Sequence, residues 1–381
     1  MRIAFDAKRI YQNTTGLGNY SRTLVSSLAF SFPEHQYHLY APRLTSLFDA
    51  SEMENLHVHQ PNDFISKRFK SLWRSSRVKK NLLRDHIDIY HGLSHEIPVD
   101  IQKTGIKTVV TIHDLIMEKY PSQFKFIDRT IYHQKFLNAC KHADKIISVS
   151  EQTKKDIIDI YGIDANKITT TYQSCNKTFY QHVSTEQKNE LRKAYQLPET
   201  FFLYVGSIIE RKNLLGICKA YALNKRKDLP PLVVVGKGDD YMKKVKQFIQ
   251  SEKLESDIIF LSELSPNSAG KFNLAALYQM SAGLIYPSIY EGFGIPLLEA
   301  MACGTMVITS QLSCLPEVGG DAALYVDPFA PDSILDAMMK VTSDHQYVTD
   351  QIAKGRKQAE LFKEDICAQK VMNVYQSLMH G

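Results

Sequence analysis

Two glutamates separated by seven residues, Glu291 and Glu299, lie in the stretch of this 381-residue chain where spacing points most clearly to chemistry. Gly294 and Pro296 lie between them, and Gly304 closes the stretch. A proline at the first helical position and a glycine just past the last one are typical of helix ends. The stretch therefore predicts a glycine loop followed by a short helix, with Pro296 at its first position and Glu299 in its first turn.

The predicted helix start is suited to a phosphate ligand. Glycine lets the backbone approach a ligand closely, and the first amide groups of a helix have no partner within it. A carboxylate at Glu299 can accept two hydrogen bonds from a vicinal diol such as a ribose, and Glu291 can accept from sugar hydroxyls. The competing interpretation is structural: Glu299 only complements the helix dipole, and the glycines only turn the chain.

Two adjacent cations offer the charge that a bound diphosphate needs. Arg211 and Lys212 follow Gly206 and Ser207 at the end of a predicted strand, residues 201–205. Arg211 presents a fork of donors to phosphate oxygens, and Lys212 presents a compact charge. Taken alone, such a pair is more often a solvated surface feature.

A divalent metal in the same role would need paired carboxylates beside the phosphates. The chain has no Asp-x-Asp sequence, and Asp239 and Asp240 are adjacent, so their side chains point in different directions. We therefore predict transfer chemistry without a metal and without a cofactor other than the donor substrate. Gly236, before this acidic pair, either borders the nucleotide base or serves as a plain turn.

A second glycine loop, with Gly16 and Gly18, follows the first predicted strand, residues 2–5. A dinucleotide fingerprint would require a third glycine where Ser21 stands and an acidic residue at the end of the second strand, where Ala41 and Pro42 follow. The loop therefore argues against binding of NAD. The alternative is that its glycines let the backbone approach a phosphate or an acceptor closely.

Histidines follow two further predicted strands of the first half. His113 and Asp114 come directly after residues 107–112, and His91 follows residues 87–90. A lone histidine at a strand end is more often a packing residue than a catalyst. Their positions at carboxyl edges of the predicted sheet make His113 a candidate for a ligand site in the cleft, and His91 and Asp114 candidates at the same edge.

The elements that would position these residues alternate between short apolar runs and helical stretches. Near-continuous apolarity is typical of strands buried on both faces, so both halves are predicted to be α/β units with parallel sheets. The predicted strands are residues 2–5, 37–40, 87–90, 107–112, 145–149, 201–205, 232–235, 258–261, 283–286, 306–308 and 324–326.

The length of the chain predicts two domains. We expect residues 1–180 to form an acceptor domain and residues 181–354 a donor domain. The helical segment from about residue 355 to 381 is expected to pack back on the first. Two doubly wound sheets place the carboxyl ends of their strands on either side of a shared cleft.

Composition excludes several other classes of protein. The chain is 44% hydrophobic and 23% charged, so it is globular rather than disordered. A net charge of +5 is weak support for nucleic acid binding. Six scattered cysteines without a C-x-x-C pair indicate a reducing compartment. Because charges occur early in the chain and no long apolar run is present, we expect a cytoplasmic protein. A peripheral position on the inner face of the membrane is the alternative.

The stretch around the two glutamates resembles the signature of family 4 of the retaining glycosyltransferases, and residues 315–328 are similar to the family's next block. The resemblance implies the GT-B fold, with two Rossmann-like domains facing across a cleft. It further implies transfer of a hexose of mannose or glucose type from a nucleotide diphosphate sugar to a glycan or glycolipid hydroxyl. Two positions depart from the family: Thr15 replaces a common glycine, and residues 173–176 lack the usual Asn-Gly.

The resemblance and the residue types together assign the site residues. The catalytic candidates are Arg211, Lys212, Glu291 and His113; the donor-binding candidates are Gly16, Gly18, Gly206, Ser207, Gly236, Phe293, Gly294, Ile295, Pro296, Leu297 and Glu299; the acceptor-side candidates are His91 and Asp114.

The resemblance implies retention of anomeric configuration, for which two mechanisms are conceivable. Double displacement needs a nucleophilic carboxylate with a partner acid about 5 Å away. Glu291 and Glu299 are better suited to holding hydroxyls, so we predict front-face attack, in which the departing phosphate takes the acceptor proton. Two other functions stay open: a non-hydrolysing sugar-nucleotide epimerase, and a non-catalytic nucleotide-sugar or membrane-surface binding protein.

A basic cluster occupies residues 64–84, where eight residues are Lys or Arg and none is acidic. Its apolar residues keep roughly helical spacing, which suits an anionic membrane surface. The alternative is an ordinary amphipathic helix with its apolar side in the core. Nucleic acid is not expected here, because no aromatic stacking platform accompanies the charge.

Overall fold

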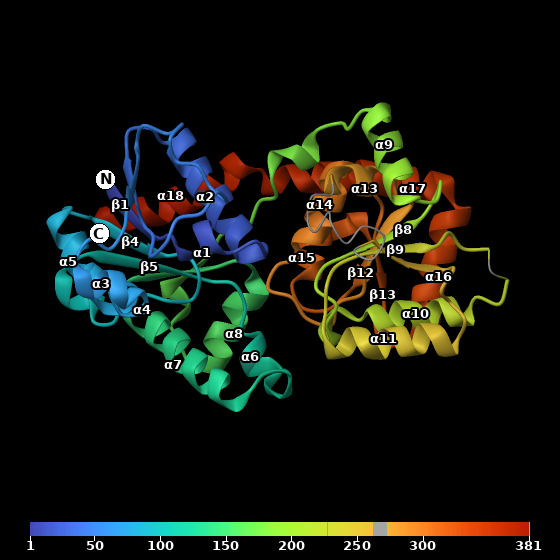
Figure 1. Ribbon diagram of the computed structural model, residues 1–381, viewed down its shortest axis with the longest axis horizontal. Coiled ribbons are helices and arrows are strands. Elements are labelled where there is room, and N and C mark those ends of the chain that lie inside the picture. The colour runs from blue at the N-terminus through green and yellow to red at the C-terminus, as the bar shows by residue number, and fades with distance from the viewer. Residues whose placement is uncertain (227, 262–272, 381) are drawn as a thin grey trace. The chain divides into compact units, whose positions relative to one another are not determined.

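The chain divides into two compact units in the computed structural model, which describes residues 1–226, 228–261 and 273–380 (Figure 1). The first unit contains Met1–Ser174 and Lys363–Gly381, and the second contains Cys175–Phe362. The sequence predicted a boundary near residue 180 and a returning segment from about residue 355. The observed division lies a few residues earlier, and the return begins later, at Lys363.

The first unit is built on a sheet of seven strands that all pair in parallel, in the order β3-β2-β1-β4-β5-β6-β7. The order reverses between β1 and β4, which makes this pair a switch point where doubly wound folds bind ligands. The strands are β1 (Arg2–Asp6), β2 (Gln36–Tyr40), β3 (Leu56–His59), β4 (Ile89–Gly92), β5 (Lys107–Ile112), β6 (Lys145–Ser148) and β7 (Ile168–Thr170).

Helices cover this sheet and include the last helix of the chain. Residues of α18 and α2 belong to one buried apolar cluster, and the two helices lie side by side (Figure 1). The helices are α1 (Lys8–Gln12), α2 (Gly16–Ser31), α3 (Phe64–Arg68), α4 (Lys70–Leu72), α5 (Val78–Arg84), α6 (Ile116–Lys119), α7 (Phe126–His142), α8 (Glu151–Tyr161) and α18 (Glu364–Met379).

The second unit is built on six parallel strands in the order β10-β9-β8-β11-β12-β13, with its switch point between β8 and β11. The strands are β8 (Phe202–Val205), β9 (Leu232–Val235), β10 (Ile258–Phe260), β11 (Gly283–Tyr286), β12 (Val307–Ser310) and β13 (Ala323–Val326). The described helices are α9 (Thr185–Tyr195), α10 (Leu214–Leu223), α11 (Asp240–Ser251), α13 (Leu274–Met280), α14 (Ile295–Cys303), α15 (Leu315–Gly319), α16 (Pro331–Ser343) and α17 (His345–Ala359).

Two predictions about elements were incomplete. Strands β3 and β7 were not predicted, because β3 alternates apolar residues with histidines and β7 has only three residues. The C-terminal helical segment is not one element: α17 belongs to the second unit and α18 to the first. All six cysteines lie within the described residues and are buried free thiols. No helix among the described residues is long and apolar enough to span a bilayer.

Candidate functional site

The loops that follow β8 and β11 hold one another at the switch point of the second unit. The N–H of Ile289 donates to the carbonyl of Arg211 at 2.8 Å, and the Ser288 hydroxyl oxygen lies 3.1 Å from the same carbonyl oxygen. Residues about 80 positions apart in the chain therefore form one structure. Since ligands of doubly wound sheets bind at such a switch point, these loops are the candidate donor site.

A buried carboxylate and two buried cations lie at the centre of these loops. Arg211 Nη1 is 2.7 Å from Glu291 Oε1, and Lys212 Nζ is 3.3 Å from the same oxygen. The hydroxyls of Tyr286 and Ser288 each donate to that oxygen at 2.8 Å. Lys212 also donates to the Tyr286 hydroxyl. The structure thus brings together three of the four predicted catalytic residues in one network.

The electrostatics of this network keep Glu291 ionised. Burial alone would raise the pKa of Glu291, but Lys212 and Arg211 outweigh it and lower that pKa to about 2. Burial lowers the pKa of Lys212, and Glu291 opposes that effect. The cluster contains two cations, Arg211 and Lys212, and one anion, Glu291, so it keeps a net positive charge. A net positive charge suits an anionic diphosphate.

Helix α14 begins one residue earlier than predicted. Gly294, with φ 97°, precedes the helix in the left-handed conformation that favours glycine, and Pro296 is the second helical residue. Gly304 follows the helix at φ 73°, as expected. The prediction that Glu299 lies in the first turn was therefore wrong, because Glu299 is the fifth residue of the helix and lies just past that turn.

Glu299 has a buried partner that the sequence did not indicate. The Tyr278 hydroxyl, from α13, donates to Glu299 Oε2 at 2.9 Å. Burial raises the pKa of Glu299 to about 7, although the hydrogen bond from Tyr278 and the charge of Lys212 both act in the opposite direction. Glu299 therefore changes its charge near neutral pH, whereas Glu291 does not.

Two glycines allow close contacts between the loops of this site. Gly206 has φ 141°, and a Cβ atom there would lie 3.1 Å from Lys212 Nζ. A Cβ atom on Gly236 would lie 1.9 Å from the carbonyl oxygen of Gly206. The carbonyl of Ser207 accepts from the Tyr204 hydroxyl at 3.0 Å. Packing thus accounts for Gly236 as a turn against Gly206, which was one of its two predicted roles.

The apolar donor-site candidates differ in burial. Phe293 is buried edge-to-face against Phe362, with ring centroids 5.7 Å apart. Leu297 is fully buried in α14. Ile295 and Pro296, by contrast, stay partly exposed at the helix start.

His113 lies at the carboxyl end of β5 in the first unit, and it is buried and neutral. Its Nε2 donates to the Leu93 carbonyl at 2.9 Å, and its Nδ1 is 3.3 Å from Gln173 Nε2. Because a carbonyl only accepts, the proton is on Nε2 and Nδ1 accepts from the Gln173 amide. Burial and then the charge of His95 lower the pKa of His113 to about 3. His113 is therefore uncharged near neutral pH, and both of its ring nitrogens already have partners in the first unit.

The structure gives His91 a packing position instead of the acceptor-side position that was predicted. The side chain is fully buried, and its ring nitrogens lie 2.6 Å from the Tyr375 hydroxyl and 2.8 Å from the Thr111 hydroxyl. Asp114 accepts from the N–H of Ile116 at 3.1 Å and stays partly exposed.

The two glycines of the N-terminal loop differ in their surroundings. A Cβ atom on Gly18 would lie 1.9 Å from the carbonyl oxygen of Asn13, whereas Gly16 has nothing within 4 Å of such an atom. The Asn13 side chain accepts from the N–H groups of Thr15 and Gly18 at 2.9 and 3.0 Å. Gly18 is thus required for packing, and Gly16 leaves open space at the start of α2.

Comparison with known proteins identifies the family. The sequence profile "Glycosyltransferase Family 4" matches residues 14–176, and "Glycosyl transferases group 1" matches residues 187–358. The chain is 30% identical to the O-antigen chain mannosyltransferase B of Escherichia coli, over 99% of this chain and the full length of that relative. The chain belongs to glycosyltransferase family 4.

Solved structures agree on the fold of this family 4 enzyme. A glycosyltransferase from Rickettsia africae ESF-5 matches with a TM-score of 0.76 and 17% identity, covering 99% of this chain and 98% of that one. Alr3699/HepE from Anabaena, in complex with UDP and glucose, matches with a TM-score of 0.73 and 15% identity, covering 99% of each chain. The fold is GT-B with two parallel α/β sheets, and the family implies retention of configuration. The chain is thus a glycosyltransferase of the hexosyl-transferring class.

Sequence reasoning missed Tyr278 and Tyr286 in the donor site of this family 4 enzyme, and Gln173 beside His113 in the first unit. Tyr286 ends β11 immediately before the glycine loop, so its place at a strand's carboxyl end was a usable signal. Tyr278 and Gln173 had none, because their partners lie 21 and 60 residues away in the chain.

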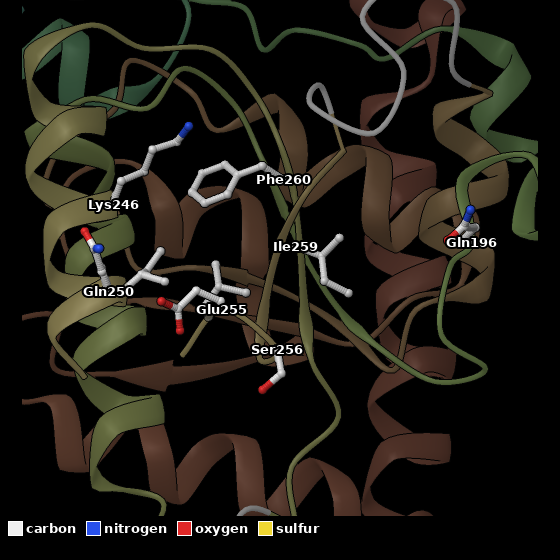
Figure 2. A pocket seen from close by; sticks show the side chains of 9 residues that line it. Gln196, Lys246, Gln250, Glu255, Ser256, Ile259 and Phe260 are labelled. Carbon is white, nitrogen blue, oxygen red and sulfur yellow. The ribbon is translucent and has the colours of Figure 1, made fainter. Parts of the chain in front are cut away.

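A cavity of about 610 Å³ lies elsewhere in the second unit, between α11 and the edge strand β10 (Figure 2). Lys246, Glu255, Ser256 and Phe260 are among its lining residues. Strand β9 separates β10 from β8, so the cavity lies at the edge of the sheet and away from the switch point between β8 and β11. Among its described lining residues are no predicted site residues, and we do not count it as part of the donor site.

Proposed function

We propose that this enzyme transfers mannose from a nucleotide diphosphate mannose to a hydroxyl of a glycan or lipid-linked glycan, with retention and without a divalent metal. The observation that carries the chemistry is the buried Arg211–Lys212–Glu291 cluster at the switch point of the second unit. The choice of mannose is supported by the full-length relative, an O-antigen chain mannosyltransferase. The binding of a nucleotide is supported by the related HepE structure, which contains UDP and glucose.

The cluster suits a departing diphosphate. When the bond between the anomeric carbon and the phosphate oxygen breaks, negative charge develops on that oxygen, and preorganised cations stabilise it most in the transition state. Arg211 and Lys212 supply those cations, together with the first amide groups of α14. Glu291 is assigned to hydroxyls of the transferred sugar, and Glu299 to the ribose.

The front-face route requires no protein nucleophile. The acceptor oxygen attacks the anomeric carbon from the side on which the diphosphate leaves, and the leaving phosphate oxygen takes the acceptor proton. His113, neutral and hydrogen-bonded, is assigned to contact with the transferred sugar rather than to proton transfer. Gly16, with open space around it, is assigned to the approach of substrate.

A donor screen tests this function. GDP-mannose, UDP-glucose and related donors are compared for thermal stabilisation, which rises with the logarithm of ligand over dissociation constant. Release of nucleoside diphosphate is then measured with lipid-linked glycans, with and without chelator. We expect mannose transfer that chelation leaves unchanged. Conversion of donor without acceptor would instead indicate an epimerase, and binding without turnover on any acceptor would indicate a binding protein.

A further inference from the structure

The basic cluster of residues 64–84 has two parts with opposite environments. Val78 and Leu82 of α5 are buried in the core of the first unit, as an ordinary amphipathic helix requires. Phe64–Leu72 is different, because most of its apolar side chains are exposed. The helix breaks between α3 and α4 at Phe69, where φ is −114° and ψ is 64°.

The segment Phe64–Leu72 presents four apolar side chains to solvent. Phe64 is 86% exposed and Phe69 is 58% exposed, and Ile65 and Leu72 are exposed as well. A single exposed apolar side chain is ordinary, but four within nine residues form a patch. Nine residues of helix span roughly 14 Å, so the patch is local.

Three exposed cations alternate with these apolar residues. Lys67, Arg68 and Lys70 form no ion pair with any residue in the described parts of the chain. Of the five cations that follow, three are paired: Arg74 with Asp6 and Glu96 at 2.6 Å each, Arg77 with Asp63, and Arg84 with Asp85. Lys79 and Lys80 form no ion pair within the described parts of the chain, but in Phe64–Leu72 all three cations lie among exposed apolar side chains.

The segment is held firmly at both ends. Asp63 accepts from the N–H of buried Ser66 at 2.9 Å, and Arg77 Nε donates to the Ser66 hydroxyl at 3.2 Å. At the other end the buried Trp73 donates from its indole to Asn81 at 3.0 Å. These anchors hold the apolar side chains outside the core, so their exposure is a property of the fold.

We propose that Phe64–Leu72 docks this enzyme on an anionic lipid bilayer. The apolar side chains would enter the boundary between headgroups and acyl chains, while Lys67, Arg68 and Lys70 contact anionic headgroups. The charge complementarity specifies the partner: an apolar interface with a protein would not need three unpaired cations among its apolar residues. The proposal goes beyond sugar transfer and does not depend on the identity of the donor.

A second exposed apolar run lies at the start of α7 and provides a comparison. Phe126 and Ile127 are strongly exposed, but Asp128 follows them directly in the first turn. Asp63 precedes Phe64 in a similar way, but it is paired with Arg77 at 3.4 Å, whereas Asp128 forms no ion pair within the described parts of the chain. An uncompensated carboxylate beside apolar residues opposes binding to anionic lipid, so we assign docking to Phe64–Leu72 and not to α7.

Vesicle flotation with the full chain tests the proposal. The vesicles are phosphatidylcholine alone, or phosphatidylcholine and phosphatidylglycerol in equal parts, at low and high salt. Since each cation near the surface is worth about 1 kcal/mol, the triple variant Lys67→Gln/Arg68→Gln/Lys70→Gln should lower partitioning on the order of a hundredfold at low salt. The triple variant Lys141→Gln/Lys154→Gln/Lys155→Gln, which removes the same charge from α7 and α8, should partition like the unmodified enzyme.

A second pair of variants tests how much the apolar side chains contribute to vesicle binding. Phe64→Ala should weaken partitioning roughly tenfold, whereas Phe30→Ala should not, although both side chains are 86% exposed. Equal effects of the two triple variants, equal binding to neutral vesicles, or loss of binding in Phe126→Ala/Ile127→Ala alone would each overturn the proposal. So would a patch variant that changes only the oligomeric state or nucleic acid binding.

Discussion

Lys212 lies directly over Gly206: a Cβ atom on that glycine would come within 3.1 Å of Lys212 Nζ and 3.3 Å of Cδ. Gly206 also has φ 141°, which side chains rarely adopt. Because Gly206 has no side chain, the side chain of Lys212 can lie against the backbone just after β8. The glycine therefore determines where the ammonium group is placed.

The substitution Gly206→Ala should displace Lys212 and lower kcat/KM at least tenfold. Gly105→Ala is the matched control, because Gly105 has φ 79° with nothing within 4 Å of a Cβ atom. Both variants carry backbone strain of about 1 kcal/mol and should lose some thermal stability. Steady-state kinetics that show equal activity for the two variants would contradict the placement of Lys212.

Removal of the charge itself is a separate test. Lys212→Met keeps the length and packing of the side chain, and we expect kcat to fall on the order of a hundredfold with little change in donor KM, because the charge on the leaving group grows toward the transition state. Lys340→Met is the control, since Lys340 lies over the ring of Tyr347 as Lys212 lies over that of Tyr286. An unchanged kcat for Lys212→Met removes the residue from the mechanism.

Tyr278 should set the pH dependence of donor binding. With the pKa of Glu299 at about 7, donor KM should rise as the pH falls below neutral, because a protonated carboxyl is a weaker acceptor for ribose hydroxyls. The Tyr278 hydrogen bond lowers that pKa, so Tyr278→Phe should move the midpoint to higher pH, by about one unit. Tyr221→Phe, which removes a buried hydroxyl bonded to the Pro230 carbonyl, should leave the midpoint in place.

Glu299 should also make the stability of the enzyme depend on pH. Its pKa in the folded chain, about 7, lies above its ordinary value of 4.5, so its contribution is present below 4.5 and is lost as the pH rises through 7. Glu299→Gln should therefore gain stability relative to the unmodified enzyme as the pH rises, on the order of 3 kcal/mol above pH 8. Denaturation without donor at low and high pH measures the difference, and a constant difference would show that folding does not raise the pKa of Glu299.

The regular strands could be predicted from sequence, whereas the contacts of the site could not. Residues 107–112, 232–235 and 283–286 were predicted with their observed bounds, because β-branched runs buried on both faces leave few alternatives. Arg211 and Glu291 were both assigned to the site, yet their ion pair depends on which strands become neighbours. That choice is made by the topology of the whole sheet, which no local pattern contains.

For the basic cluster of residues 64–84, the sequence likewise could not predict which apolar side chains are exposed. Its apolar spacing is compatible with one helix, and the sequence left core and membrane as alternatives. The structure separates them at Phe69, whose backbone leaves the helical region. The residues after this break turn toward the core at Val78, while those around it stay exposed. Tertiary anchors at Ser66 and Trp73, and not periodicity, decide which apolar side chains are buried.

Gln173 should control the charge of His113. The Gln173 amide donates to Nδ1, and the pKa of His113 is lowered to about 3, so the activity profile should show no step from this histidine near neutral pH. Gln173→Glu has the same shape but places a carboxylate beside Nδ1, which favours the charged imidazolium and should move the pKa upward by several units. Ring resonances of His113, assigned with a His113→Asn variant, should then titrate near neutral pH, while those of exposed His133 stay unchanged. A His113 ring that titrates identically in both enzymes would contradict the contact with Gln173.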